Sequence, residues 1–120
     1  MAEKVSKERL EEILSQDSIV LLDIYTDTCP PCKMLAPVME RLSEEYADRA
    51  TVVKMDGVEE REFTSGLGIS SVPTVILYIN GEERGRMMGF RPESYYAKVL
   101  NDQLGLMSEP EEGASEDGVS

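Results

Sequence analysis

The segment Cys29-Pro30-Pro31-Cys32 constrains the fold most, because it holds both cysteines of the chain and joins two contrasting patterns. Residues 18–25 before it form a nearly continuous apolar run, typical of a strand buried on both faces. After it, apolar residues recur at helical spacing over about residues 31–47. At the start of a helix, unpaired backbone N–H groups and the helix dipole stabilise a thiolate. The position therefore favours dithiol chemistry over two cysteines that lie close together only for packing.

The rest of the chain alternates helical and strand patterns without an internal repeat. Besides the strand at about 18–26 and the long helix, the patterns predict a helix over 7–16, a strand at 51–55, a short helix at 59–66, strands at 74–79 and 84–88, and a last helix from Pro92 through Leu104. Pro37 is expected to bend the long helix. Asn80-Gly81 is a strong signal for a two-residue hairpin turn. This order indicates an α/β sandwich with a mixed sheet.

The formal net charge of −12 argues against nucleic acid and anionic membrane surfaces as partners, because both require a basic patch. Part of this charge lies near the C-terminus, where acidic residues occur with almost no apolar ones. We therefore expect residues 105–120 to form a disordered acidic tail and residues 1–104 to form the folded domain.

The N-terminus lacks an apolar signal segment, and no run approaches the roughly 20 apolar residues of a membrane span. We therefore expect a cytoplasmic protein whose thiols are usually kept reduced. With two cysteines and no histidine, a single copy is short of ligands for mononuclear zinc.

Five segments, in this order, resemble the thioredoxin family over about residues 6–104. They are the central strand with a buried aspartate at residues 21–25, the active-site segment at 29–33, the kinked helix at Ala36-Pro37, the cis-proline loop at 68–74, and the terminal hairpin at 80–82 with Gly89. The resemblance implies a thioredoxin fold with a central mixed sheet flanked by helices. Only residues 1–5 precede the first helix, so the family's first strand is expected to be short or missing.

The chain departs from the family pattern around the cysteines. Thioredoxins usually have tryptophan immediately before the first cysteine and again shortly before it, whereas Thr28 and Tyr25 hold these positions here. Pro30 replaces the usual glycine and deletes one backbone N–H, which is expected to weaken thiolate stabilisation. Without the tryptophans, the surface on which a standard reductase and standard clients would dock differs from that of the family.

The resemblance assigns roles to the two cysteines. Cys29 resembles the exposed nucleophile that attacks a client disulfide as a thiolate, and Cys32, one turn deeper, would resolve the mixed disulfide. Asp23 is the candidate base for Cys32, because burial raises the pKa of a carboxyl. The alternative for Asp23 is a structural carboxylate. Lys54 resembles the family's lysine that pairs with that aspartate, and a purely structural role is equally compatible with the sequence.

The resemblance also implies a client-binding segment. Val72-Pro73 is expected to be a cis bond facing Cys29, which leaves the Val72 backbone free to pair with an extended client. The alternative is that Pro73 merely begins a strand. Thr28, Pro30 and Gly89 are the further candidates for client contact.

The most direct interpretation is a protein-disulfide reductase that works through a reversible Cys29–Cys32 disulfide and needs no other cofactor. Its partners would be disulfide-containing client proteins and an electron donor resembling thioredoxin reductase, and we expect a monomer. One alternative is a non-catalytic adaptor that binds a specific partner through the same fold. A less favoured alternative is a dimer whose four cysteines bind a metal or an iron–sulfur cluster.

Overall fold

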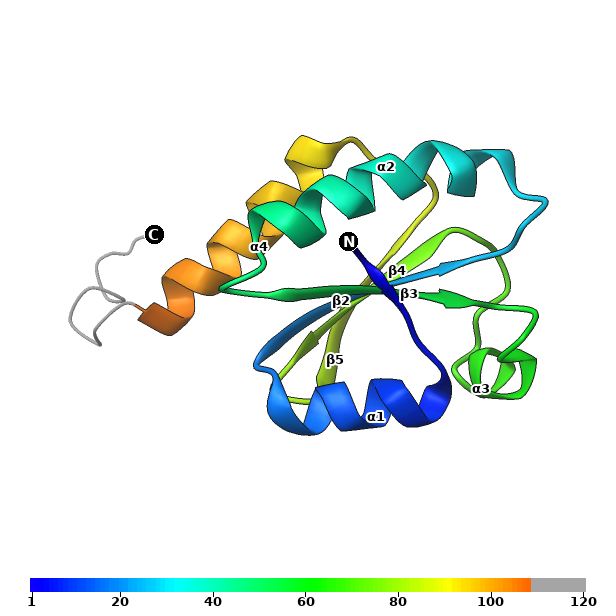
Figure 1. The fold of residues 1–120 in the computed structure, drawn as a ribbon, viewed down its shortest axis with the longest axis horizontal. Coiled ribbons are helices and arrows are strands. Elements are labelled where there is room, and N and C mark those ends of the chain that lie inside the picture. The colour runs from blue at the N-terminus through cyan, green and yellow to red at the C-terminus, as the bar shows by residue number, and fades with distance from the viewer. Residues whose placement is uncertain (109–120) are drawn as a thin grey trace.

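A computed structural model describes residues 1–108, which form a five-stranded sheet with helices on both faces (Figure 1). The elements, in chain order, are β1 (Glu3–Lys4), α1 (Lys7–Gln16), β2 (Ile19–Tyr25), α2 (Pro30–Glu45), β3 (Thr51–Asp56), α3 (Arg61–Gly66), β4 (Thr74–Ile79), β5 (Glu82–Met88) and α4 (Glu93–Ser108). Every predicted helix and strand is present, with shifts of a few residues at the ends.

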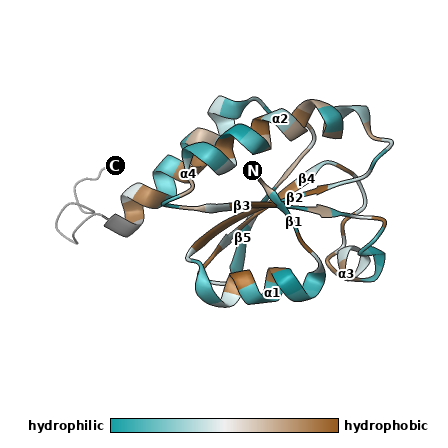
Figure 2. Ribbon diagram, in the orientation of Figure 1, coloured by the Kyte–Doolittle hydropathy of each residue, from teal (hydrophilic) through white to brown (hydrophobic). Residues whose placement is uncertain are grey.

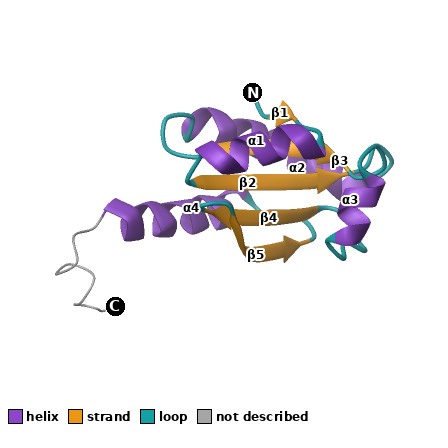
Figure 3. Cartoon of the chain, turned by 90° about the horizontal axis from the view of Figure 1, so that it is seen from below, coloured by secondary structure: helices purple, strands orange, loops and turns teal. Residues whose placement is uncertain are grey.

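The strand order is β1-β3-β2-β4-β5, with β1, β3 and β2 parallel and with β4 and β5 antiparallel to their neighbours. Helices α2 and α4 cover one face of the sheet, and α1 and α3 lie on the other (Figures 1 and 3). The first strand, β1, spans two residues and pairs with β3. The predicted thioredoxin fold, with its mixed sheet and short first strand, is confirmed.

Alternation along β2 divides the core into two layers. Ile19 and Leu21 pack in the layer under α2 and α4, whereas Val20 and Leu22 pack in the layer against α1. Figure 2 shows the central strands as the most hydrophobic part of the chain. Because side chains alternate along a strand, Asp23 falls on the same face as Leu21. The Asp23 carboxyl therefore lies on the side of the sheet that α2 covers.

The hairpin and the last helix both extend further than the sequence predicted. Asn80 and Gly81 adopt φ values of 52° and 84°, as a two-residue primed turn requires, so β5 begins at once at Glu82. Helix α4 continues to Ser108, four residues beyond the predicted end of the last helix at Leu104. Once a helix is formed, each added residue gains a hydrogen bond that roughly offsets the conformational entropy it loses, so a single glycine at position 105 does not have to end the helix. The remaining part of the predicted tail, 109–120, lies outside the described residues.

Helix α2 accommodates Pro37 in its interior and is continuous from Pro30 to Glu45. Its buried side includes Leu35, Val38 and Met39, which pack on the sheet. Within residues 1–108, no helix is both long and apolar enough to cross a membrane.

Candidate active site

The two cysteines lie at the N-terminus of α2, directly after the loop that follows β2. Cys29 is the N-cap of the helix, and its Sγ accepts a hydrogen bond from the Cys32 N–H at 3.2 Å. Pro30 and Pro31 occupy the first two helical positions, where an N–H has no partner within the helix. The cysteines are joined by a disulfide.

This geometry refines the expected effect of the prolines on a Cys29 thiolate. An N-cap side chain accepts from the N–H of the second or third helical residue. The third residue is Cys32, which donates, and the second is Pro31, which has no N–H. The loss of a donor to the sulfur is therefore a property of Pro31 rather than of Pro30.

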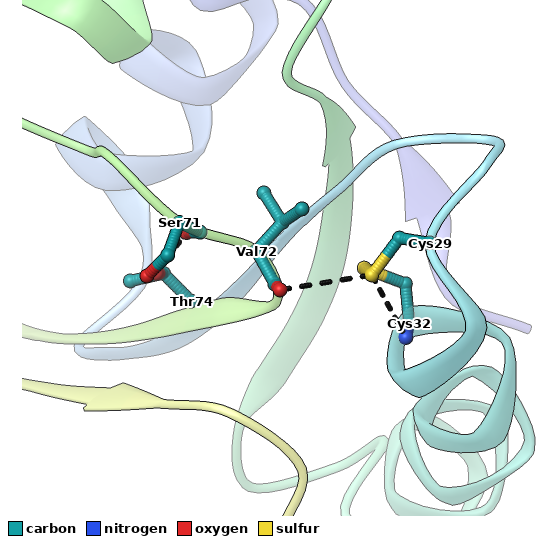
Figure 4. Close-up of a disulfide and its surroundings, with 5 residues drawn as sticks. All are labelled: Cys29, Cys32, Ser71, Val72 and Thr74. Atoms are coloured by element: carbon teal, nitrogen blue, oxygen red, sulfur yellow. Dashed lines mark hydrogen bonds between the residues drawn. A yellow bond between two sulfur atoms is a disulfide. The ribbon is translucent and has the colours of Figure 1, made fainter.

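Both cysteines are buried in the disulfide form, with Cys29 8% and Cys32 3% exposed. The order of exposure agrees with the expected roles, but Cys29 is not the open surface group that the sequence predicted. The reason is a second segment that lies over it, because the carbonyl oxygen of Val72 is 3.6 Å from Cys29 Sγ. Figure 4 shows this approach between the Val72 loop and the start of α2.

The Val72 loop is anchored on both sides. The Val72–Pro73 peptide bond is cis, and the Thr74 hydroxyl donates to the Ser71 carbonyl at 2.7 Å. The Gly89 N–H donates to the Pro73 carbonyl at 2.8 Å, which places the end of β5 beside the loop. Gly89 has a φ of 85°, a conformation that side chains other than glycine rarely adopt.

The candidate client-binding residues gather around Cys29. β4 begins at Thr74, so Val72 precedes the strand and its backbone is not used in the sheet. Val72 is half-buried and Gly89 is partly exposed, whereas Thr28 and Pro30 are exposed on either side of Cys29 in the chain.

Asp23 lies behind the disulfide and lines a cavity of about 280 Å³ together with Cys32 and Lys54. It is only 3% exposed, and its Oδ1 has no hydrogen-bond partner within the described chain. Burial raises the pKa of Asp23 to about 7, although the positive charge of Lys54 acts in the opposite direction. A carboxyl that titrates near neutrality beside Cys32 can exchange a proton with it through water in the cavity.

Lys54 does not form the ion pair with Asp23 that the resemblance implied. Lys54 is directly opposite Asp23 in the β2–β3 register and lines the same cavity. Its ion pair within residues 1–108, however, is with Glu40 of α2, at 3.5 Å from Nζ to Oε2. Lys54 therefore acts on Asp23 through longer-range attraction rather than through an ion pair.

Glu40 is the residue of this region that the sequence prediction missed. It follows Cys32 and Ala36 at intervals of four residues, so the three side chains lie along one row of α2. That spacing was visible in the sequence. The contact with Lys54 was not, because it depends on how α2 crosses β3.

Comparisons with known proteins agree with this geometry. The family model described as Thioredoxin matches residues 1–102. The thioredoxin of Alicyclobacillus acidocaldarius subsp. acidocaldarius is 37% identical over 94 residues, which cover 78% of this chain and 90% of that protein. The thioredoxin of Bacillus subtilis (strain 168) is 34% identical over 90 residues, covering 75% and 86%. Among solved structures, a thioredoxin from Plasmodium falciparum superposes with a TM-score of 0.77 at 29% identity, covering 84% of this chain and 98% of that one.

Proposed function

The chain belongs to the thioredoxin family and is a thiol–disulfide oxidoreductase, and on that premise we propose how its Cys-Pro-Pro-Cys segment reduces the disulfides of client proteins. One observation supports the proposal most: Cys29 Sγ lies against the Val72 carbonyl, while Cys32 lines the cavity that contains Asp23. The two sulfurs thus have different surroundings, as two different chemical roles require.

In the first step, the Cys29 thiolate attacks one sulfur of the client disulfide. A Cys29–client mixed disulfide forms, and the other client sulfur leaves as a thiolate. In the second step, the Cys32 thiolate attacks Cys29 Sγ, the Cys29–Cys32 disulfide closes, and the second client sulfur leaves. Two electrons pass from the cysteine pair to the client.

Asp23 accepts the proton that Cys32 must lose before the second step. With a pKa of about 7, its carboxylate is a stronger base than an ordinary aspartate and is still available at neutral pH. The chain has no histidine that could serve instead.

The client binds as an extended segment beside the cis-proline loop. The Val72 backbone pairs with the client, and Pro73 and Gly89 form the floor and edge of the contact. Thr28 and Pro30 complete the exposed surroundings of Cys29, in place of the tryptophan and glycine that are usual in the family.

An electron donor resembling thioredoxin reductase returns electrons to the Cys29–Cys32 disulfide, and the cycle we propose uses no cofactor besides that disulfide. We propose that the protein acts as a monomer in the cytoplasm. Under these conditions the electron flow is toward clients.

The trapping of mixed disulfides tests the roles of the cysteines. A Cys32→Ser variant should attack clients through Cys29 and remain bound to them, since no second sulfur displaces the client. The trapped complexes should dissociate when dithiothreitol is added. The matched Cys29→Ser variant should trap almost nothing, because Cys32 is 3% exposed. Equal trapping by the two variants would contradict the assignment of nucleophile and resolving cysteine.

If neither variant traps a protein while the reduced wild type binds a partner, the adaptor alternative is correct instead. An absorbance spectrum of freshly purified protein checks the iron–sulfur alternative, since a cluster absorbs in the visible range.

A redox titration against glutathione tests the direction of electron flow. We expect a potential nearer about −270 mV, as in reducing thioredoxins, than about −120 mV, as in a strong oxidant. A value above roughly −180 mV would show a protein suited to oxidising or isomerising clients.

A further inference from the structure

Glu40 makes two contacts that join three separate segments of the fold. Its Oε2 is 3.5 Å from Lys54 Nζ of β3, and its Oε1 accepts a hydrogen bond from the Ala2 N–H at 2.8 Å. Glu40 and Lys54 are both about one-third exposed, at 31% and 34%. Solvent weakens such a pair without abolishing it, so its direct contribution to stability is small.

The position of Lys54 matters more than the strength of the pair. Lys54 lies directly across the strand ladder from Asp23, and both line the cavity behind Cys32. Two carboxyl groups, Asp23 and Glu40, are therefore near one flexible ammonium group. Within residues 1–108, this ammonium is paired with Glu40, and Asp23 Oδ1 has no hydrogen-bond partner.

We infer that Glu40 is a positioning residue that holds the Lys54 ammonium away from Asp23 and thereby keeps Asp23 a strong enough base for Cys32. The inference rests on the proposed role of Asp23 as proton acceptor. A direct Lys54–Asp23 ion pair would stabilise the ionised carboxylate and make it a weaker base. When the Lys54 ammonium is paired with Glu40, it does not pair directly with Asp23. It still lowers the pKa of Asp23 moderately through longer-range attraction.

Other charged or titratable groups surround Asp23, but none replaces Lys54 in this role. From β4 the neighbour is the uncharged Val75. The other charged or titratable groups around the cavity are Tyr25 at the end of β2, Asp27 of the loop after it, and Cys32 and Lys33 of α2. Tyr96 of α4 also lies within electrostatic range of Asp23, and Arg91 acts on Tyr96. Apart from burial, the influence on the pKa of Asp23 comes from Lys54.

The test is a titration of the Asp23 carboxyl carbon by NMR in the oxidised protein. Glu40→Gln should lower the pKa of Asp23 by about one unit, because Lys54 is released to pair with it. Glutamine keeps an oxygen that can accept from the Ala2 N–H, so the contact with the N-terminal segment is retained. Glu44→Gln removes the same charge from an exposed position of α2 and should leave the pKa of Asp23 unchanged.

A double-mutant cycle separates this mechanism from a general effect of charge. Lys54→Met alone should raise the pKa of Asp23, and Glu40→Gln should then produce no further shift in the Lys54→Met protein. No shift in Glu40→Gln, or the same shift with and without Lys54, would overturn the inference. So would a Lys54→Met protein in which the titration of Asp23 is unchanged.

The titration needs no client and no turnover, so its outcome is independent of the trapping experiment. Failed trapping with the expected shifts would contradict the proposed function and leave the Glu40–Lys54–Asp23 arrangement intact. Successful trapping without the pKa shifts would support the proposed function and contradict the inference about Glu40. In the Cys29–client mixed disulfide, the pH dependence of resolution by Cys32 should move to lower pH in Glu40→Gln by the same amount as the pKa of Asp23. A purely structural role of Glu40 would not produce this shift.

Discussion

Asp23 is the residue at which folding stability and the proposed chemistry oppose each other. A buried carboxyl without a hydrogen-bond partner for Oδ1 is costly when ionised. Its pKa of about 7 in the folded protein, against an ordinary value of 3.8, means that the folded state binds the proton more tightly than the unfolded chain does. The contribution of Asp23 to the free energy of unfolding must therefore fall as the pH rises from about 4 to about 7.

Asp23→Asn should remove this pH dependence. At pH 8 the variant should have a higher free energy of unfolding than wild type, by on the order of 3 kcal/mol, because the ionisation cost of the buried carboxyl is gone. At pH 4 the two proteins should differ little, since Asp23 is then neutral as well. Urea denaturation of the oxidised proteins at both pH values measures the difference.

The same variant should slow resolution by Cys32 at neutral pH and leave the first attack by Cys29 largely intact. Stopped-flow kinetics with a model disulfide separate these steps. Unchanged resolution together with lower stability would mean that Asp23 has a structural role instead.

At the scale of secondary-structure elements, the junction of β2 and α2 shows how two prolines suit the start of a helix. Both occupy positions where no N–H is needed by the helix, but Pro31 deprives Cys29 Sγ of a donor. Proline at position 31 therefore favours the start of the helix but removes an N–H that could stabilise the Cys29 thiolate.

Pro31→Ala should restore this donor and increase the thiolate fraction of Cys29 in the reduced protein. The rate of alkylation by iodoacetamide at pH 6 should rise several-fold, because the thiolate is the reacting species. Pro30→Ala is the matched control, since the N–H of the first helical residue is not the one that an N-cap side chain accepts. A larger effect of Pro30→Ala would contradict the capping geometry.

The β4–β5 hairpin offers an independent test of a backbone requirement. Gly81 has a φ of 84°, and a Cβ added there would lie 3.4 Å from the Leu14 carbonyl oxygen. Gly81→Ala should lower the free energy of unfolding by about 1–2 kcal/mol, because the left-handed conformation is unfavourable for alanine. Thermal or urea unfolding measures this loss.

Gly85→Ala in β5 is the control for the hairpin. An added Cβ at Gly85 meets no atom within 4 Å, and its φ is not left-handed. Alanine there should be neutral or slightly stabilising, since it restricts the unfolded chain. Similar destabilisation by both substitutions would show that the turn is not the cause.

At the scale of the whole molecule, 24 acidic residues against 12 basic ones make electrostatic repulsion the dominant long-range effect. Ion pairs such as Lys7–Glu11 and Lys98–Asp102 are exposed and contribute little. The melting temperature should therefore rise by a few degrees between about 10 mM and about 500 mM NaCl, because salt screens the repulsion. Differential scanning calorimetry checks this, and a fall would mean that the ion pairs outweigh the repulsion.

Much of the fold follows from short stretches of sequence. The apolar run of β2, the helical stripe of α2 and the Asn80-Gly81 turn each encode their structure within a few residues, so their types and order could be predicted. The position of the cysteines between a strand and a helix, and their chemistry, could be predicted for the same reason. The predicted end of the last helix at Leu104 was too early, because a local reading of composition does not include the stability that α4 gains from packing on the core.

Contacts between distant segments depended on the assembled structure. Val72 covers Cys29 across 43 positions of chain, and this explains why Cys29 is buried rather than open. The lysine opposite Asp23 could be identified from sequence, but its pairing with Glu40 could not. Helix propensity and strand alternation specify which way a side chain faces along its own element, whereas the distance between two elements is set by the packing of all the side chains between them.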